Sequence, residues 1–357
     1  MSEKIPAVVL GGSGYVAGEV VRLLATHPGF ALAAVVSESR AGTPVVEAFP
    51  HLAGTVDGLD FADFTSLPAL LAGLPGAAGR CALVSAAPHG ASAALVARAV
   101  ELARQAAVEL SVVDLSADFR FADAAEYARV YGHPHPAPGL LGRFRRALPE
   151  HAAGERPACV AHPGCFPTAV LLAVVPLLRL GLAEPRFAVT AVTGSTGSGR
   201  APSEKTHHPE RRSNLVAYAP LAHRHAPEMR ALAGEAAGVR PEVDFVPVSG
   251  PQARGIYAAI QGRLARPAEA AGIAAALAGF YAASPFVTVS EAPPALTEVV
   301  GTNRARLGVA VAGSALAVTV AIDNLIKGAA GGALQFLNRY FGYDEAEGLR
   351  QAGLGWL

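Results

Sequence analysis

The feature that most constrains the fold is the order of three short segments near the start of the chain. Residues 5–10 form an apolar run bounded by glycine, which is typical of a buried strand, and residues 15–25 place apolar side chains on one helical face. The turn between them fits the pattern GxGxxG/A at Gly12, Gly14 and Ala17. Between a strand and a helix, this pattern predicts a backbone that approaches the pyrophosphate of a dinucleotide. A glycine-rich turn without a ligand is the alternative. The predicted contacts are Gly12, Ser13, Gly14, Tyr15 and Val16.

Strands and helices continue to alternate in the first part of the chain. The apolar runs at 31–36, 81–87 and 111–119 predict strands, and residues 91–104 predict an amphipathic helix. Strands that alternate with helices indicate a parallel sheet. The N-terminal part is therefore expected to be a Rossmann-type, doubly wound α/β domain.

After about residue 165 the pattern changes. Longer, β-branched runs occur at 187–192, 243–248, 256–264 and 315–322, with few helices between them. They predict a C-terminal α+β domain that binds substrate, with a mixed or antiparallel sheet and helices on one face. Residues 328–341 predict a final helix. The apolar character of the second sheet favours a homo-oligomer, a dimer or a tetramer.

Composition argues against several classes of protein. The 29 basic and 29 acidic residues cancel and no stretch is strongly basic, so nucleic acid is a poor candidate partner. The longest apolar run, near 169–178, is too short to span a bilayer, and the first residues lack the pattern of a signal peptide. Three cysteines without CxxC spacing argue against a disulfide framework or a zinc site. We expect a cytoplasmic protein with no metal and no membrane partner.

The residues after the second predicted strand bear on the choice of cofactor. A carboxylate at this position favours a ribose 2′-hydroxyl, whereas serine and arginine favour a 2′-phosphate. Glu38 is of the first type, and Ser37, Ser39 and Arg40 are of the second. The balance favours NADPH over NADH.

Cys165 is the candidate nucleophile among the three cysteines. It precedes an apolar helical run, and a helix N-terminus stabilises a thiolate. A thiol in a tight turn is the alternative. Cys81 begins an apolar strand and Cys159 lies in a short apolar segment, so both are expected to be inert.

A histidine cluster about 60 residues downstream supplies candidate acids and bases. His223 and His225 stand close to Glu228 at the predicted start of a helix. A surface capping cluster is the alternative. His207 and His208 form a second pair, but adjacent histidines are more typical of a solvated loop.

Residues 193–200 predict an oxyanion-binding loop. The segment reads Thr-Gly-Ser-Thr-Gly-Ser-Gly-Arg, so glycines expose backbone N–H groups, hydroxyls can donate, and Arg200 adds a charge. A flexible hairpin is the alternative. The loop is a candidate for binding a substrate phosphate.

Seven segments of the chain carry specific motifs. They are GGSGYVAGEVVRLLATHP (11–28), DLSADFR (114–120), HPGCFPTA (162–169), GSTGSGR (194–200), HRHAPE (223–228), GTNRARLGV (301–309) and DNLIKGAAGGALQFLN (323–338). Taken together, and in this order over nearly the whole chain, they resemble the N-acetyl-γ-glutamyl-phosphate reductases of arginine biosynthesis, in the semialdehyde dehydrogenase superfamily.

The resemblance implies a domain plan and a set of sites. The NADP-binding domain would cover 1–164, the catalytic domain 165–326, and a C-terminal helix within 327–357 would return to the nucleotide domain. Lys327 and Gly328 would then contact NADPH. The substrate would be a small acyl phosphate. Its implied contacts are Arg120, Ser195, Gly197, Ser198, Arg200 and Glu228.

The implied chemistry proceeds through a thioacyl intermediate. The Cys165 thiolate expels phosphate, NADPH delivers a hydride, and a histidine assists release of the semialdehyde. His223 is the first candidate for acid/base work and His225 is the alternative.

Several alternatives stay open. The segment 206–218 resembles a branch that includes lysine-pathway reductases, which act on an α-aminoadipyl phosphate, and His162 replaces a more usual asparagine. Aspartate-semialdehyde and glyceraldehyde-phosphate dehydrogenases share the Cys/His logic but lack the combination of HRHAPE and DLSADFR. A nucleotide-binding redox sensor that switches at Cys165 is an alternative of another class.

Overall fold

The computed structural model describes residues 3–73 and 79–355, which divide into two compact units. The first contains the described residues up to Arg146, with Gly154–His162 and Ala330–Leu349. The second contains Ala147–Ala153, Pro163–Ala329 and the described residues from Arg350 onward. These units differ from the expected boundaries at 164 and 326, because the chain passes between them several times.

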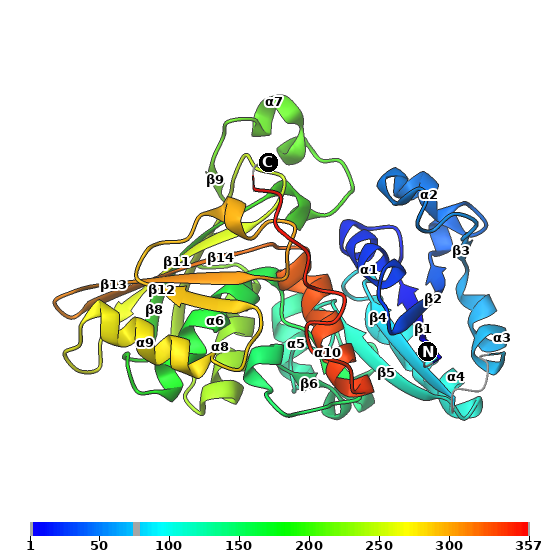
Figure 1. The fold of residues 1–357 in the computed structure, drawn as a ribbon, viewed down its shortest axis with the longest axis horizontal. Helices are drawn as coiled ribbons and strands as arrows, with labels where there is room; N and C mark the ends of the chain where they lie inside the picture. The colour runs from blue at the N-terminus through cyan, green and yellow to red at the C-terminus, as the bar shows by residue number, and fades with distance from the viewer. Residues whose placement is uncertain (1–2, 74–78, 356–357) are drawn as a thin grey trace. The chain divides into compact units, whose positions relative to one another are not determined.

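The first unit is built on one parallel sheet with the strand order β3-β2-β1-β4-β5-β7-β6 (Figure 1). Its strands are β1 (Ile5–Leu10), β2 (Phe30–Val36), β3 (Phe61–Ala62), β4 (Arg80–Ser85), β5 (Glu109–Asp114), β6 (Arg145–Arg146) and β7 (Cys159–Ala161). Its helices are α1 (Tyr15–Ala25), α2 (Val45–Ala48), α3 (Leu67–Ala72), α4 (Ser92–Gln105), α5 (Ala124–Tyr131) and α10 (Gly331–Phe341). The predicted Rossmann-type unit is confirmed.

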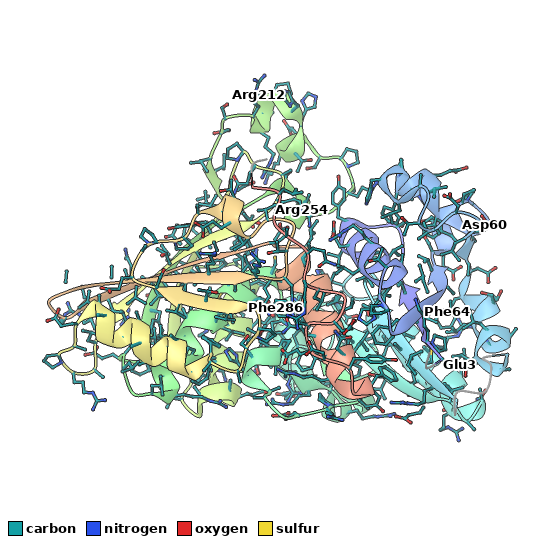
Figure 2. All side chains as sticks on the ribbon, viewed as in Figure 1. Glu3, Asp60, Phe64, Arg212, Arg254 and Phe286 are labelled. Atoms are coloured by element: carbon teal, nitrogen blue, oxygen red, sulfur yellow. The ribbon has the colours of Figure 1, made fainter. Side chains whose placement is uncertain are left out.

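Burial explains why these runs form strands. In β1 the side chains of residues 7–10 are fully buried, as expected for a strand covered on both faces. Phe64, labelled in Figure 2, lies in the same core, with the guanidinium of Arg98 over its ring. Helix α10 packs against β5, so the segment that begins at Ala330 belongs to this unit.

Two predicted elements of this unit have different limits. The strand predicted over 111–119 ends at Asp114, because the polar residues that follow fold onto the start of α4. There, the Asp118 carboxylate accepts hydrogen bonds from the backbone N–H groups of Gly90 and Ala93. The final helix begins with a π-helical turn, Ile326–Ala330, before α10.

The second unit contains a mixed sheet with the order β12-β13-β14-β11-β8-β10-β9. The β8–β10 and β12–β13 pairs are parallel and the other pairs are antiparallel. The strands are β8 (Arg186–Thr193), β9 (Val216–Ala217), β10 (Glu242–Ser249), β11 (Ile256–Arg263), β12 (Val287–Ser290), β13 (Ala305–Ala312) and β14 (Ala315–Ile322). This confirms the predicted α+β unit, although β9, β12 and β13 were not predicted.

Helices cover one face of the second sheet. They are α6 (Cys165–Arg179), α8 (His225–Ala237) and α9 (Ala270–Phe280), and Figure 1 shows them on the same side. The short helix α7 (His208–Arg211) lies in the loop between β8 and β9. Along β8 buried residues such as Phe187 and Val189 alternate with exposed ones such as Ala188 and Thr190. The exposed residues define the second face, which we call the open face.

Short 3-10 helices complete the structure. They are η1 (Glu38–Arg40), η2 (Pro50–Leu52), η3 (Phe64–Ser66), η4 (Pro138–Arg143), η5 (Pro149–His151), η6 (Ser195–Ser198), η7 (Glu204–Thr206) and η8 (Leu296–Glu298). Within residues 3–73 and 79–355, no helix is long and apolar enough to cross a membrane.

Candidate active site

Cys165 is the first residue of α6. Gly164 caps the helix in an extended conformation, and the Thr168 N–H donates to the Gly164 carbonyl at 2.8 Å. The cysteine is half-buried, so its thiol is accessible at the positive end of the helix dipole. In contrast, burial raises the pKa of Cys81 to about 12 and also raises the pKa of Cys159. Helix position and exposure therefore favour Cys165 as the nucleophile.

Glu228 fixes the turn that carries Cys165. Its side chain is fully buried, and its Oε1 accepts a hydrogen bond of 2.7 Å from the backbone N–H of Gly164. Its Oε2 lies 4.0 Å from His225 Nε2. The structure places the Glu228 carboxylate against the Gly164 amide and near His225, and its predicted contact with substrate stays a prediction.

The two predicted histidines lie together at the start of α8. Their ring centroids are 4.7 Å apart, and Phe166 packs edge-on against both rings. The His225 backbone N–H donates to His223 Nδ1 at 3.2 Å. Burial, assisted by the Arg224 charge, lowers the pKa of His223 to about 4. At neutral pH His223 is therefore uncharged, and its proton is on Nε2.

A cavity of about 870 Å³ is lined by the nucleophile, by the two histidines and by residues of the loop 193–200, which we call the hydroxyl loop. Cys165, His223 and His225 line it with three of the predicted substrate contacts, Ser195, Gly197 and Ser198. Arg200, exposed in the same loop, is not among the lining residues. The sequence had not singled out three further lining residues, Arg211, Tyr218 and Ser249.

The loop after β8 differs from the expected backbone cradle. The N–H groups of Ser195 and Thr196 donate to the carbonyls of Gln252 and Ala253, each at 3.0 Å. The Gly197 N–H donates to the Gly194 carbonyl. The hydroxyls of Thr196 and Ser198 are bonded too, because they donate to the carbonyls of Ala253 and Ser195 at 2.7 Å each. The Ser195 hydroxyl, which lines the cavity, is therefore the group of this loop best able to donate to an oxyanion.

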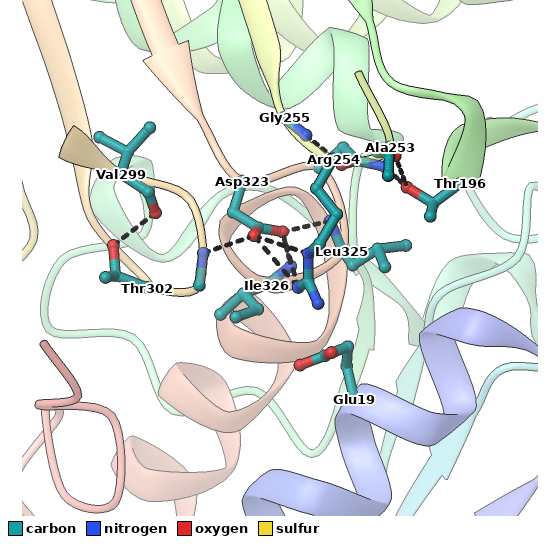
Figure 3. Close-up of polar contacts among 12 residues, drawn as sticks. Glu19, Thr196, Ala253, Arg254, Gly255, Val299, Thr302, Asp323, Leu325 and Ile326 are labelled. Atoms are coloured by element: carbon teal, nitrogen blue, oxygen red, sulfur yellow. Dashed lines mark hydrogen bonds and ion pairs between the residues drawn. The ribbon is translucent and has the colours of Figure 1, made fainter. Parts of the chain in front are cut away.

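Figure 3 shows the Asp323 carboxylate next to Arg254, Leu325 and Ile326, in the turn before α10, and Asn324 follows it in the chain. The buried Asp323 carboxylate pairs with Arg254 and accepts from three backbone N–H groups, those of Gly301, Leu325 and Ile326. Asn324 accepts from the Gly255 N–H at 2.7 Å and donates to Thr196 Oγ1 at 3.0 Å. These long-range partners were not predicted from the sequence.

The π-helical turn places Gly328 against the nucleophile. A Cβ on Gly328 would lie 2.8 Å from Cys165 Cβ and 3.1 Å from Cys165 Cα, so only glycine fits without movement. The ammonium of Lys327 is fully buried and lies 2.5 Å from Glu150 Oε1. The Lys327 ammonium is thus held in a buried ion pair, and the contact of Lys327 and Gly328 with the cofactor stays a prediction.

The predicted dinucleotide turn leaves open space at the N-terminus of α1. Gly14 caps α1, and a Cβ there would meet no described atom within 4 Å, which leaves space at the helix N-terminus. A Cβ on Gly12 would collide with Val35, so Gly12 allows the turn to pack on β2. Tyr15 and Val16 begin α1 directly after the turn, and Ser13 lies within it. The turn can hold a dinucleotide.

The residues that follow β2 are the candidate contacts of the cofactor ribose, and they differ in the hydrogen bonds that they already make. Glu38 accepts a hydrogen bond of 2.9 Å from the Phe64 N–H. Ser37 and Ser39 lie with their hydroxyls 3.5 Å apart. The guanidinium of Arg40 makes no hydrogen bond to any other described residue.

Arg120, a predicted substrate contact, donates hydrogen bonds to backbone carbonyl groups of the first unit. Its side chain is buried, with Nε donating to the His162 carbonyl at 3.0 Å and Nη2 to the Leu115 carbonyl at 2.8 Å. The described residues contain no group of three or more His, Cys, Asp or Glu side chains that could hold a metal ion.

Comparison with known proteins identifies both units. The semialdehyde dehydrogenase NAD binding domain matches residues 6–137, and the semialdehyde dehydrogenase dimerisation domain matches residues 165–324. Among solved structures, aspartate semialdehyde dehydrogenase II from Vibrio cholerae has a TM-score of 0.67 at 15% identity, covering 94% of this chain and 98% of that one. The Candida albicans aspartate semialdehyde dehydrogenase with NADP has a TM-score of 0.57 at 17% identity, over 94% and 98%. These structures share the fold.

Sequence relatives are more specific. The N-acetyl-gamma-glutamyl-phosphate reductases of Pseudomonas entomophila and Azotobacter vinelandii are each 39% identical over 356 residues. Each match covers 97% of this chain and 98% of the relative. The chain therefore belongs to the N-acetyl-gamma-glutamyl-phosphate reductase family of semialdehyde dehydrogenases.

Proposed function

We propose that this enzyme reduces N-acetyl-γ-glutamyl phosphate to N-acetylglutamate 5-semialdehyde and inorganic phosphate, with a nicotinamide cofactor and a thioester on Cys165. The observation that carries the proposal is the position of Cys165, at the start of α6 and in one cavity with His223 and the hydroxyl loop. The names of the sequence relatives support the substrate.

The covalent steps follow from the position of the thiol. The Cys165 thiolate attacks the acyl carbon, so a C–S bond forms while the C–O bond to phosphate breaks and phosphate leaves with the electron pair. A reduced nicotinamide, when bound, supplies the hydride that reduces the thioester carbon. The resulting hemithioacetal is an alkoxide, and its collapse breaks the C–S bond, which releases the aldehyde and regenerates the thiolate. The helix dipole stabilises the thiolate at both ends of this sequence.

His223 is suited to hold the oxygen of the reacting carbonyl. Its ring is neutral because its pKa is lowered to about 4, and its Nδ1 accepts the His225 N–H. Its Nε2–H can therefore donate to the oxyanion that develops when the thiolate attacks. His225, beside Glu228, is the second candidate for proton transfer.

We further propose that NADPH is preferred over NADH. Glu38, the residue that would select a 2′-hydroxyl, already accepts the Phe64 N–H. Ser37, Ser39 and the guanidinium of Arg40 stand beside it and suit a 2′-phosphate. Arg40→Ala should raise KM for NADPH more than KM for NADH, and equal effects would contradict this assignment.

The open face of the second sheet supports a homo-oligomer. The residues matched by the dimerisation-domain model include this sheet, whose strand β8 alternates buried and exposed residues. We propose that a second copy covers this face in a dimer, or in a tetramer built from dimers. The three free cysteines fit our expectation, from the sequence, of a cytoplasmic enzyme.

The test is the reverse reaction, the phosphate-dependent reduction of NADP+ by two aldehydes measured in parallel. N-acetylglutamate semialdehyde should be the better substrate than its one-carbon-longer aminoadipate homologue, and the opposite order would indicate the lysine-pathway activity. Cys165→Ser should abolish turnover and retain NADPH binding, while Cys81→Ser stays active. Wild-type NADPH binding without turnover of either aldehyde would instead favour a redox sensor.

A further inference from the structure

Arg211 is a cation of the active-site cavity that the steps above do not use. It is the last residue of α7 and lines the cavity that also contains Cys165. Its Nη1 donates to the hydroxyl of Ser249, at the end of β10. Its Nε and Nη2 atoms are shielded from solvent and have no hydrogen-bond partner among the described residues. A guanidinium held in this way has two donors still to satisfy.

The two unsatisfied donors have a defined geometry. Nε–H and Nη2–H lie on one edge of the planar guanidinium and point in nearly the same direction, which matches the two oxygens of a carboxylate or phosphate. The bond from Nη1 to Ser249 fixes the orientation of the plane. The observed arrangement is therefore that of a bidentate oxyanion site.

The guanidinium of Arg211 and the thiol of Cys165 both act electrostatically on the same phenol, that of Tyr218. The phenol therefore lies within electrostatic reach of each. Burial raises the pKa of Tyr218 to about 12, so the phenol does not neutralise the guanidinium. Burial also lowers the pKa of Arg211, so pairing with an anion would offset the cost of desolvation.

We propose that Arg211, oriented by Ser249, binds the α-carboxylate of the N-acylated amino acid substrate. This inference depends on the proposed function, in which the substrate carries an acyl phosphate at one end and a carboxylate at the other. The hydroxyl loop is joined through Thr196 and Asn324 to the turn that packs on Cys165, so that loop suits the phosphate at the reacting carbon. Arg211 is then available to the opposite end of the substrate.

The test uses the full-length enzyme in the reverse direction, where aldehyde and phosphate are separate substrates. N-acetylglutamate semialdehyde is compared with 4-acetamidobutanal, which differs only in lacking the carboxylate. Arg211→Gln should raise KM for the first aldehyde by ~10- to 100-fold, the value of a lost charge-assisted pair, with a smaller change in kcat. On 4-acetamidobutanal the same variant should behave like wild type within about 2-fold. Arg211→Lys should recover only part of the affinity, because it lacks the fork.

Arg212→Gln is the matched control. Arg212, labelled in Figure 2, is exposed and does not line the cavity, so its loss should change neither KM. Equal losses on both aldehydes, in a variant with wild-type thermal stability, would overturn the proposal. A raised KM for phosphate with an unchanged KM for aldehyde would also overturn it, by assigning the guanidinium to the phosphate. Wild-type enzyme inactive on N-acetylglutamate semialdehyde would overturn the proposed function and this inference with it.

Discussion

Replacing Gly328 with alanine tests whether the turn before α10 positions the nucleophile. The new Cβ would lie 2.8 Å from Cys165 Cβ, whereas ordinary van der Waals contact begins at 3.4 Å, so one side must move by about 0.6 Å. A second close approach, 3.1 Å, is to Cys165 Cα, and backbone cannot rotate away as a flexible side chain can. Overpacking of this kind costs about 1–3 kcal/mol of stability.

The effect on catalysis should exceed the effect on stability. A displacement of half an ångström at a reacting atom is enough to degrade alignment, and 1 Å costs about 100-fold, so we expect kcat to fall by about 10- to 100-fold. Turnover, urea unfolding and the rate of Cys165 alkylation by iodoacetamide would be measured together.

The control for Gly328→Ala is Gly272→Ala. Gly272 lies in α9, where a Cβ would meet no described atom within 4 Å. That variant should gain up to about 1 kcal/mol in helix stability and keep its kcat. A stable Gly328→Ala enzyme with wild-type kcat and wild-type alkylation would refute the positioning argument.

Two further predictions concern charged groups. The pKa of His223 is lowered to about 4 in the folded protein, whereas a histidine in the unfolded chain is protonated below about pH 6.5. Between these values the unfolded chain binds the extra proton, so His223 lowers the free energy of unfolding increasingly as pH falls from about 6.5 towards 4. His223→Asn should remove that pH dependence in urea unfolding and lower kcat by ~10²–10³-fold; an unchanged kcat would move the donor to His225. Lys327→Met should destabilise the protein by about 3–5 kcal/mol by removing the cationic partner of the buried Glu150, and the added change Glu150→Gln should recover much of the loss. A cost below about 1 kcal/mol in the single variant would contradict this reading of the pair.

Local sequence patterns predicted an element correctly where the residues of that element alone determine its structure. Residues 15–25 form α1 with the predicted limits, and residues 315–322 form β14 with the predicted limits. The same holds for the place of Cys165 as the first residue of α6, which Gly164 and the apolar residues that follow it indicate. In each case the signal and the structure lie within a few residues of one another.

The strand β13 shows why other elements were not predicted. Its sequence, ARLGVAVA, contains Gly308, and glycine is depleted in strands. In the structure a Cβ at this position would lie 2.7 Å from the Ala292 carbonyl oxygen and 2.8 Å from Thr319 Oγ1. Glycine is required because a distant segment of backbone approaches the strand, and single-strand periodicity carries no information on that approach.

The predicted substrate contacts divide according to what surrounds them. Ser195 and Ser198 line the cavity, whereas Glu228 and Arg120 are buried and bonded to backbone groups. Residue type alone gives the same expectation for an arginine in a cavity and an arginine against carbonyl groups. Only the three-dimensional structure distinguishes these two environments. It also shows that Arg211, which was not predicted from the sequence, lines the cavity.

The backbone around Cys165 is held by segments that are remote in the sequence. Glu228 bonds the amide of Gly164, 64 residues away, and Gly328 packs directly on Cys165. Asp323, paired with Arg254, fixes the turn that contains Gly328. These contacts act on the Gly164 amide and on the Cα and Cβ atoms of Cys165, so they position the nucleophile through its backbone. The position of the nucleophile is thus set by three separate parts of the second unit.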